Sequence, residues 1–468
     1  MREPVGDLAV VLHSHMPYVE GFGTYPFGEE WLFEAFARSH LPVLEVARDV
    51  TISVTPVLAD QLEAPGVPAR MRTFLHEHRL AAAERDAAEA AALAGAARAE
   101  AARYRRALAR LDELGDDLLA AFRAAQAERG VALLGSAATH AVLPLVATDA
   151  ARRLHIDAGL RSHRRRFGAT GGLWLPECAY EPGLERLLAD HGLGYFCIDQ
   201  SARERPIDSL APARTPSGPL AFTLDWETVS LVWSRNGYPS DPAYLEFHRL
   251  SPNGIRLWAI GGDPYDADAA AQRAERDAAR FVDHVAARLR GFRAKRDRPG
   301  LVSFAIDTEL LGHWWTEGAA WLDAVMRLAP PSGIRLCTLP DAAERHGGEE
   351  RALRASSWGE GKDLRTWDSP RVADLAWGAR RLELRLVEAL AARRLGRAAA
   401  ERAARELLAV QASDWAFLDA KRQAGDYPHA RVLGHSESLL QAIDSREPPD
   451  PRMRNLAPDL SLAPLLEP

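Results

Sequence analysis

Residues 7–18 read DLAVVLHSHMPY, a short apolar run that ends in polar side chains. This pattern is typical of a buried strand that presents polar groups at its carboxyl end. Helical patterns, notably at 182–191 and 267–292, separate several similar runs. Those runs lie at 51–58 (TISVTPVL), 131–136 (VALLGS), 171–177 (GGLWLPE), 194–199 (GYFCID) and 301–307 (LVSFAID). Strands that alternate with helices predict parallel βαβ units, and we expect an α/β barrel.

The segments outside these runs have helical patterns. Residues 70–128 are rich in Ala, Arg and Glu, which favour helices, and they indicate a helical insert in a larger scaffold. The chain after residue 345 is again helical in pattern. We therefore expect a catalytic α/β barrel over 1–345, a helical C-terminal domain over 346–445, and an irregular tail over 446–468, which is rich in Pro and polar residues.

The composition is that of a soluble globular protein, with 47% hydrophobic and 26% charged residues among 468. A net charge of −7 argues against nucleic acid as a partner. The three cysteines have no CxxC spacing, which fits a reducing compartment. The first apolar run is too short for a signal peptide, and no run approaches the roughly 20 apolar residues that span a bilayer. We expect a cytoplasmic protein without membrane association.

Two acidic side chains, Glu177 in GLWLPECAY and Asp307 in FAIDTELLGHWW, directly follow strand patterns. In a parallel α/β barrel the carboxyl ends of the strands meet on one face, which carries the chemistry. A carboxylate beside a buried strand is costly unless it is paired, hydrogen-bonded or used. Two of them near Trp174, Trp314 and Trp315, which could stack on sugar rings, suit glycoside cleavage by a nucleophile and an acid. Each could instead be the structural partner of an arginine.

His13 and His15 would share one side of a strand, because alternate residues point the same way. Such an HxH pair can bind a metal ion if further ligands are near, and His140 and Asp307 are available for that role. Hydrogen bonds from the histidines to substrate hydroxyls or to a carboxylate are the interpretation that we favour.

Further candidates lie close to these motifs. Glu309 could raise the pKa of Asp307 by like-charge repulsion, or be held in a buried hydrogen-bond network. His313 follows in the same stretch. Trp358 and Trp367 bracket SSWGEGKDLRTW, a Gly-rich loop too polar for a core, and they indicate a platform for sugar unless they pack inside.

A series of stretches, taken together, resembles glycoside hydrolase family 57 and in particular its α-1,4-glucan branching enzyme group. They run in the family's order from residue 12 to about 418: LHSHMPYV with PFGEEWLFEA, GSAATHAVLPLV, GLWLPECAYEPGLE, FAIDTELLGHWWTEG, ASSWGEGKDLRTW and QASDWAFL. The resemblance implies a distorted (β/α)7 barrel whose cleft is completed by a helical C-terminal domain. It also implies an α-1,4-glucan substrate, such as amylose or a maltooligosaccharide, and no metal or other cofactor.

By the same resemblance, Glu177 matches the nucleophile and Asp307 the general acid/base of a retaining enzyme. The other matches belong to the glucan cleft: Trp358, Asp414 and Gln423 would contact the glucan, Trp233 and Trp367 would line the cleft, and His13 and His140 match histidines of the first two motifs. By pattern alone, the SDW stretch around Asp414 and the side chain of Gln423 indicate a helix N-cap and a surface amide.

The sequence departs from the family at several positions. Leu224-Asp225 stands where an Arg-Asp pair is usual, and Ser240 replaces a glycine. The segment after Asp199 is short, although in the family this neighbourhood supplies a mobile loop, with a tyrosine, that favours transfer to sugar over water. The alternatives are therefore an α-amylase or a 4-α-glucanotransferase of the same family. Outside it, the alternatives are a metal-dependent hydrolase or deacetylase built on the HxH pair, and a weakly active glycan-binding protein.

Overall fold

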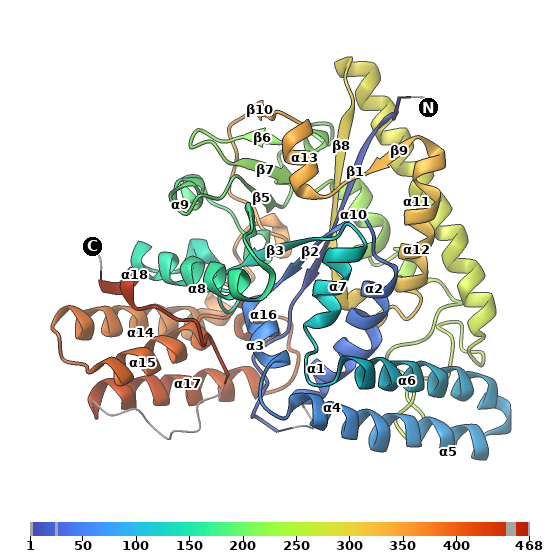
Figure 1. Cartoon of the computed structure of the whole chain (residues 1–468), viewed down its shortest axis with the longest axis horizontal. Coiled ribbons are helices and arrows are strands. Elements are labelled where there is room, and N and C mark those ends of the chain that lie inside the picture. The colour runs from blue at the N-terminus through green and yellow to red at the C-terminus, as the bar shows by residue number, and fades with distance from the viewer. Residues whose placement is uncertain (1–2, 24–26, 446–454, 467–468) are drawn as a thin grey trace.

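A computed structural model describes residues 3–23, 27–445 and 455–466. Within these residues the core of the fold is one sheet with the strand order β10-β6-β7-β5-β4-β3-β2-β1-β8, and β9 also pairs with β1 (Figure 1). The strands are β1 (Gly6–Ser14), β2 (Thr51–Val54), β3 (Ala132–Ser136), β4 (Gly172–Trp174), β5 (Tyr195–Ile198), β6 (Ala213–Arg214), β7 (Leu220–Thr223), β8 (Gly300–Asp307), β9 (Ile334–Leu336) and β10 (Glu349–Glu350).

The sheet forms a distorted barrel. Along the path β7-β5-β4-β3-β2-β1-β8 every neighbouring pair is parallel, whereas β6 runs antiparallel to β7. The two ends of this path meet where the backbone N–H of Asp225, just after β7, donates to the carbonyl of Ser303 in β8 at 2.9 Å. The predicted fold class, an α/β protein with a distorted (β/α)7 barrel, is confirmed. All polar residues at the carboxyl ends of these strands consequently open on one face.

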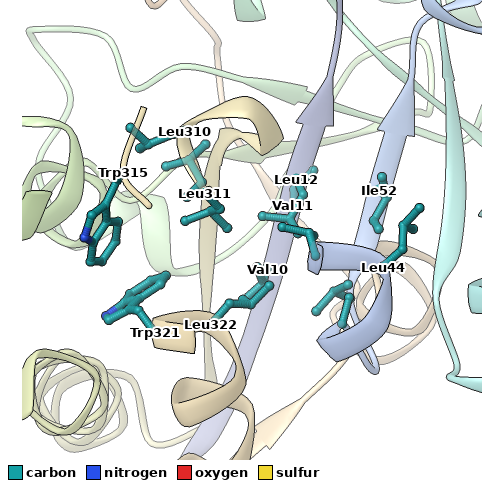
Figure 2. Close-up of a cluster of buried hydrophobic side chains, with 14 of the residues drawn as sticks. Val10, Val11, Leu12, Leu44, Ile52, Leu310, Leu311, Trp315, Trp321 and Leu322 are labelled. Atoms are coloured by element: carbon teal, nitrogen blue, oxygen red, sulfur yellow. The ribbon is translucent and has the colours of Figure 1, made fainter. Parts of the chain in front are cut away.

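Strand β1 passes through the centre of the core, and all nine of its residues are buried. Figure 2 shows Val10 and Leu12 of β1 beside Ile52 of β2 and close to Trp321 and Leu322 of α12 (Gly318–Leu328). Full burial of each such side chain is worth about 1.5–3 kcal/mol relative to exposure. This packing fixes β1 rigidly, and with it the polar residues that follow.

Helices cover the barrel from outside. The longest, α11 (Ala267–Arg296), begins at Asp266, whose side chain accepts from the backbone N–H groups of Asp268 and Ala269. Helix α8 (Asp149–Phe167) is capped in the same way by Thr148. The other helices of the barrel are α1 (Glu29–Ala35), α2 (Leu41–Val46), α3 (Pro56–Leu62), α7 (Ala120–Glu128), α9 (Leu184–Asp190), α10 (Trp226–Trp233) and α13 (Leu339–Arg345).

Two groups of helices extend from the barrel (Figure 1). The first comprises α4 (Val67–Phe74), α5 (Ala81–Glu89) and α6 (Ala94–Leu114), in the region of the predicted insert. The second comprises α14 (Ala373–Ala391), α15 (Arg397–Val410), α16 (Ser413–Ala420) and α17 (Tyr427–Asp444), in the region of the predicted C-terminal domain. The exact domain boundaries stay predictions. Among the described helices, none combines the length and apolar character that a bilayer crossing requires.

Helix α16 joins the second group to the barrel. Ala412 forms an antiparallel bridge with Ala141, and the N–H of Ser413 donates to the carbonyl of His140 at 3.1 Å. The start of α16 thus lies against the face on which the strands end. Of the predicted tail, residues 446–454 and 467–468 lie outside the described residues, while Ala463–Leu466 form the short helix α18, which packs on α8.

Candidate active site

Glu177 lies in a sharp turn after β4. Its backbone has φ 59° and ψ 19°, and Cys178 follows with φ 47°. Such left-handed values are costly for residues other than glycine, and they cluster at functional sites. The carbonyl of Glu177 accepts from the N–H of Trp358 at 2.9 Å, which helps to hold the turn. The side chain keeps 20% of its surface exposed while its neighbours in the turn are buried, so the carboxyl group faces an opening.

Asp307 is the last residue of β8, in register with His13 on the neighbouring strand β1. Burial raises the pKa of Asp307 well above its usual value, the charges of Glu309 and Glu177 raise it further, and His15 acts in the opposite direction. His13 beside Asp307 is linked through hydrogen bonds of His140 and Ser413 to Glu177, so the two carboxyl groups belong to one site.

The pKa values of the two carboxyl groups are shifted by different neighbours. Burial is the largest cause that raises the pKa of Glu177, to about 7, and the charge of Asp414 acts in the same direction. The hydrogen bond from Ser413 and the charge of His15 limit this rise. The pKa of Asp307 is likewise raised, with Glu309 as an additional nearby negative charge. Glu177 has the hydrogen bond from Ser413 instead, so the two carboxyl groups have different surroundings.

Three histidines form a stacked cluster beside Glu177. The Nε2 atoms of His13 and His140 lie 2.9 Å apart, and His13 Nδ1 is 2.6 Å from the hydroxyl of Ser53. His140 Nδ1 is 2.9 Å from the hydroxyl of Ser413, which in turn donates to Glu177 at 2.8 Å. Burial, together with the charge of a neighbouring histidine, lowers the pKa of His13 and of His140 well below the usual value, so both are neutral.

The pKa of His15 is shifted in the opposite direction. Burial acts to lower its pKa, but the carboxylates of Asp414, Glu309 and Glu177 raise it above the usual value. Its Nε2 lies 3.0 Å from Asp414 and its Nδ1 3.1 Å from the hydroxyl of Thr55. Asp414 therefore holds His15 from the side of α16 and favours its protonated form.

Glu309 is held in a buried network, which was one of its two predicted roles. It accepts from His40 Nε2 at 2.6 Å and from the backbone N–H of His15 at 3.0 Å. His40 ends a π-helix, Phe36–His40, a rare form that often occurs at functional sites. The other predicted role, raising the pKa of Asp307, is fulfilled as well.

The predicted sugar-stacking tryptophans divide into two groups. Trp314 and Trp233 are exposed over 51% and 49% of their surfaces, and Trp358 is partly exposed, so these rings are open to a ligand. Trp314 stacks on Phe247 with ring centroids 4.4 Å apart.

Three other tryptophans are buried, and the expectation that they offer exposed faces to sugar is wrong. Trp174 is packed between His13 and Trp358, with ring centroids 4.6 and 5.0 Å away. Trp315 packs beside Trp321 in the main core (Figure 2). Trp367 packs against Val142 and Ala179, because the loop that carries it folds back on the barrel. Trp174 and Trp367 can still shape the cleft as supports for Trp358 and the turn around Glu177.

The remaining predicted residues have distinct settings. His313 is mostly buried, its carbonyl accepts from Arg256 at 2.7 Å, and burial with the charge of Arg256 lowers its pKa well below the usual value. Gln423 is exposed in the turn after α16, and its backbone N–H donates to the carbonyl of Leu418. Their predicted contacts with glucan stay predictions.

The family departures have local explanations. Leu224 is buried in the main core, and Asp225 is held by Ser209, Thr228 and Arg288. Asp199, just before the short segment, makes a contact that was not expected. It pairs with Lys362 from the loop of Trp358, and the ammonium group of Lys362 also lies over the ring of Trp226.

Other partners in the site were not predicted. Ser53 and Thr55 face His13 and His15 across the sheet, and a hint lay in the alternating hydroxyl residues of TISVT. The pattern around Ser413 and Asp414 predicts a helix N-cap, which is wrong: Ala412 is the N-cap of α16, and no side chain caps this helix. The hydroxyl of Ser413 instead contacts Glu177, 236 residues away. No local pattern encodes such a contact.

The histidine nitrogens are used in hydrogen bonds rather than left free for a metal ion. Both ring nitrogens of His13, His15 and His140 have protein partners. Across the described ranges no group of three or more His, Cys, Asp or Glu side chains has the arrangement of a metal site.

Comparisons with known proteins agree with this geometry. The sequence model described as Glycosyl hydrolase family 57 matches residues 9–353, and that described as 1,4-alpha-glucan branching enzyme, C-terminal, matches residues 379–456. The 1,4-alpha-glucan branching enzyme TK1436 of Thermococcus kodakarensis is 34% identical over 93% of this chain and 73% of that protein. The probable 1,4-alpha-glucan branching enzyme Rv3031 of Mycobacterium tuberculosis is 32% identical over 93% and 91%. A crystal structure of a GH57-type branching enzyme from Pyrococcus horikoshii matches with a TM-score of 0.91 at 31% identity, covering 99% of this chain and 97% of that one.

Proposed function

The chain belongs to glycosyl hydrolase family 57, and on that premise we propose that it is a 1,4-α-glucan branching enzyme that acts by double displacement. The observation that carries the proposal is the carboxyl pair at the carboxyl ends of β4 and β8, with Glu177 bonded to Ser413 and Asp307 beside Glu309. A retaining glycosidase needs two such carboxyl groups, one as acid and one as nucleophile. The match of the branching-enzyme model to the C-terminal helices supports branching as the outcome.

In the first step Asp307 protonates the oxygen of an α-1,4 linkage while Glu177 attacks the anomeric carbon. The linkage breaks, the leaving chain departs with the proton, and a β-linked glycosyl-enzyme remains on Glu177. This chemistry calls for carboxyl groups about 5–5.5 Å apart. The protonated form of His15 lowers the pKa of both carboxyl groups and so offsets part of their repulsion.

In the second step Asp307, now a carboxylate, removes a proton from an acceptor hydroxyl, and that oxygen displaces Glu177. The two inversions restore the α configuration. A glucan 6-hydroxyl as acceptor gives a branch, a 4-hydroxyl gives disproportionation, and water gives hydrolysis. The half-exposed rings of Trp233 and Trp314 are suited to hold the acceptor chain and exclude water.

Incubation with amylose tests the proposal. The product is divided, and one half is treated with a debranching enzyme before chain lengths are measured. We expect new short chains that are released only by debranching, together with α-1,6 anomeric signals in the proton NMR spectrum. Reducing ends that increase without α-1,6 linkages would assign the protein to the hydrolases of its family instead.

The matched control is Glu177→Gln, which keeps the size and hydrogen-bonding capacity of the side chain but cannot attack. We expect turnover to fall by at least about 10³-fold, while amylose still binds with an affinity close to that of the wild type. Substantial activity in this variant would remove Glu177 from the nucleophile's role. The cytoplasmic location remains a prediction from composition.

A further inference from the structure

A continuous chain of hydrogen bonds crosses the site and ends on the nucleophile. It runs from Ser53 to His13 at 2.6 Å, from His13 to His140 at 2.9 Å, from His140 to Ser413 at 2.9 Å, and from Ser413 to Glu177 at 2.8 Å. Its members come from β2, β1, the loop after β3, the start of α16 and the turn after β4. Apart from the carboxyl group of Glu177, all of them are buried.

The chemistry of these groups fixes the position of every proton once the charge of Glu177 is given. A carboxylate only accepts, so Ser413 donates its single hydroxyl proton to Glu177 and must accept from His140 Nδ1. A neutral imidazole has one N–H, so His140 Nε2 accepts, and His13 Nε2 is the donor to it. His13 Nδ1 then accepts from the hydroxyl of Ser53.

The reverse order of protons is the alternative state of the same chain. In that state Glu177 is protonated and donates to Ser413, Ser413 donates to His140 Nδ1, and His13 Nδ1 donates to Ser53. The two states differ in both histidine tautomers. The tautomers of two buried rings therefore report whether the nucleophile is charged.

The surroundings of His13 and His140 keep both rings neutral, and the chain of hydrogen bonds requires neutral rings. Burial lowers the pKa of both rings. The ring of His15 stacks on His140 with centroids 4.1 Å apart, and a positive charge on His15 lowers the pKa of both His13 and His140 as well.

We propose that in the working enzyme this chain runs one way, from Ser53 to Glu177, and that Ser413 is the positioning residue that holds the nucleophile as a carboxylate. The proposal rests on the proposed function, since it concerns the nucleophile of that reaction. The helical C-terminal region thereby takes part in the chemistry and does not merely close the cleft. Ser413 acts through Glu177 and does not itself react with the substrate.

The position of Ser413 does not depend on its hydroxyl group. Its backbone N–H is bonded to the carbonyl of His140, and Ala412 is bridged to Ala141. Ser413→Ala should therefore remove the last link of the chain and leave the backbone in place. The other titratable groups that face Glu177 are unchanged by the substitution: His15, His140, Cys178, Asp307 and Asp414.

The first test is the pH profile of kcat/KM on a soluble maltooligosaccharide for the wild type, Ser413→Ala and Ser413→Thr. The hydrogen bond from Ser413 lowers the pKa of Glu177, so its loss raises that pKa. We expect the acidic limb of Ser413→Ala to move to higher pH by about one pH unit, with activity lost about 10-fold at pH 6 and mostly recovered above pH 8. Threonine keeps the hydroxyl and should restore the wild-type limb.

Ser436→Ala is the matched control, because that hydroxyl bonds to the carbonyl of Val432 within α17, away from the site. Its profile should equal that of the wild type. A loss of activity in Ser413→Ala that is the same at every pH would overturn the proposal, since it would mean that Ser413 only supports the structure. An acidic limb that does not return in Ser413→Thr would do the same.

The second test needs no activity and no variant. Neutron diffraction from perdeuterated crystals at a pH above 8 should show deuterium on His140 Nδ1 and His13 Nε2, with none on His140 Nε2 or His13 Nδ1. Deuterium on both nitrogens of either ring, or the opposite tautomers, would overturn the proposal. If the amylose assay fails while the tautomers are as expected, the proposed function is wrong but the chain of hydrogen bonds stands.

Discussion

Glu309 lies two residues beyond Asp307, and its charge acts together with burial to raise the pKa of Asp307. Burial alone raises the pKa of both carboxyl groups, so it cannot assign their roles. Asymmetry comes from the neighbours: Ser413 donates to Glu177, whereas Asp307 has Glu309 beside it. Ser413 and Glu309 thus give the two carboxyl groups different surroundings.

Glu309→Gln should therefore change the pH profile in a defined direction. It removes a negative charge near Asp307 but keeps an oxygen that can accept from His15 and His40. The pKa of Asp307 falls, so the acid is lost at lower pH. We expect the basic limb of kcat/KM to move to lower pH by about one unit, with a smaller effect on the acidic limb. A basic limb that stays in place would mean that Glu309 does not tune the acid.

At this scale the sequence singled out two carboxyl groups that the structure places in one site, but not their partners. Glu177 and Asp307 stood out because each follows an apolar strand run directly. Their neighbours come from segments hundreds of residues away: Ser413 contacts Glu177 across 236 residues, and His40 contacts Glu309 across 269. Such contacts depend on how the whole chain packs, which no local pattern reveals.

At the scale of elements, buried ion pairs connect the helical group α4 to α6 with the barrel. Arg38, in the π-helix Phe36–His40, lies 2.5 Å from Glu100 of α6, and Arg103 also pairs with Glu100. Burial by itself would raise the pKa of Glu100, but the two arginines hold it at about 2. A buried charge that is so well paired becomes costly when one partner is removed.

Glu100→Gln should lower the free energy of unfolding at pH 7 by about 3 kcal/mol, because Arg38 stays buried with less compensation. The folded pKa of Glu100 lies below the value of 4.5 in an unfolded chain. Its stabilisation is therefore present above pH 4.5 and is lost as the pH falls toward 2. Thermal melts at pH 7 and pH 3.5 should show that the difference in melting temperature between wild type and variant is smaller at pH 3.5.

Glu84→Gln is the control for this effect, because Glu84 pairs with Arg105 in solvent, where such pairs contribute about 0–1 kcal/mol. Equal destabilisation by the two substitutions would contradict the role given to the buried pair. Equal gaps at both pH values would contradict the linkage to Glu100.

Strands and helices were predicted well because their signals are local. The six apolar runs all contain strands of the sheet, and they place polar residues at the carboxyl ends. The exposure of the tryptophans was harder to predict, because a ring on a polar loop can face solvent or pack against the core. Trp358 remains partly exposed, whereas Trp367, nine residues later, is buried against Val142 and Ala179.

At the scale of the whole molecule, the site is assembled from both ends of the chain. β1 supplies His13, the residue just after its end is His15, and α16 supplies Ser413 and Asp414, which bond to His140 and His15. The C-terminal helices therefore contribute polar partners to the site. The resemblance to a family could indicate that these helices help to form the cleft, but the hydrogen bonds themselves required the structure.

The central claim is that Glu177 forms a covalent bond to the sugar while Asp307 supplies and removes the proton. Asp307→Asn, incubated with α-maltosyl fluoride, tests it most directly, because fluoride leaves without an acid and the second step lacks its base. Mass spectrometry of the intact protein should show the addition of one maltosyl unit, and the peptide that contains Glu177 should carry it. A label on a different residue, or released sugar of the β configuration, would contradict the account.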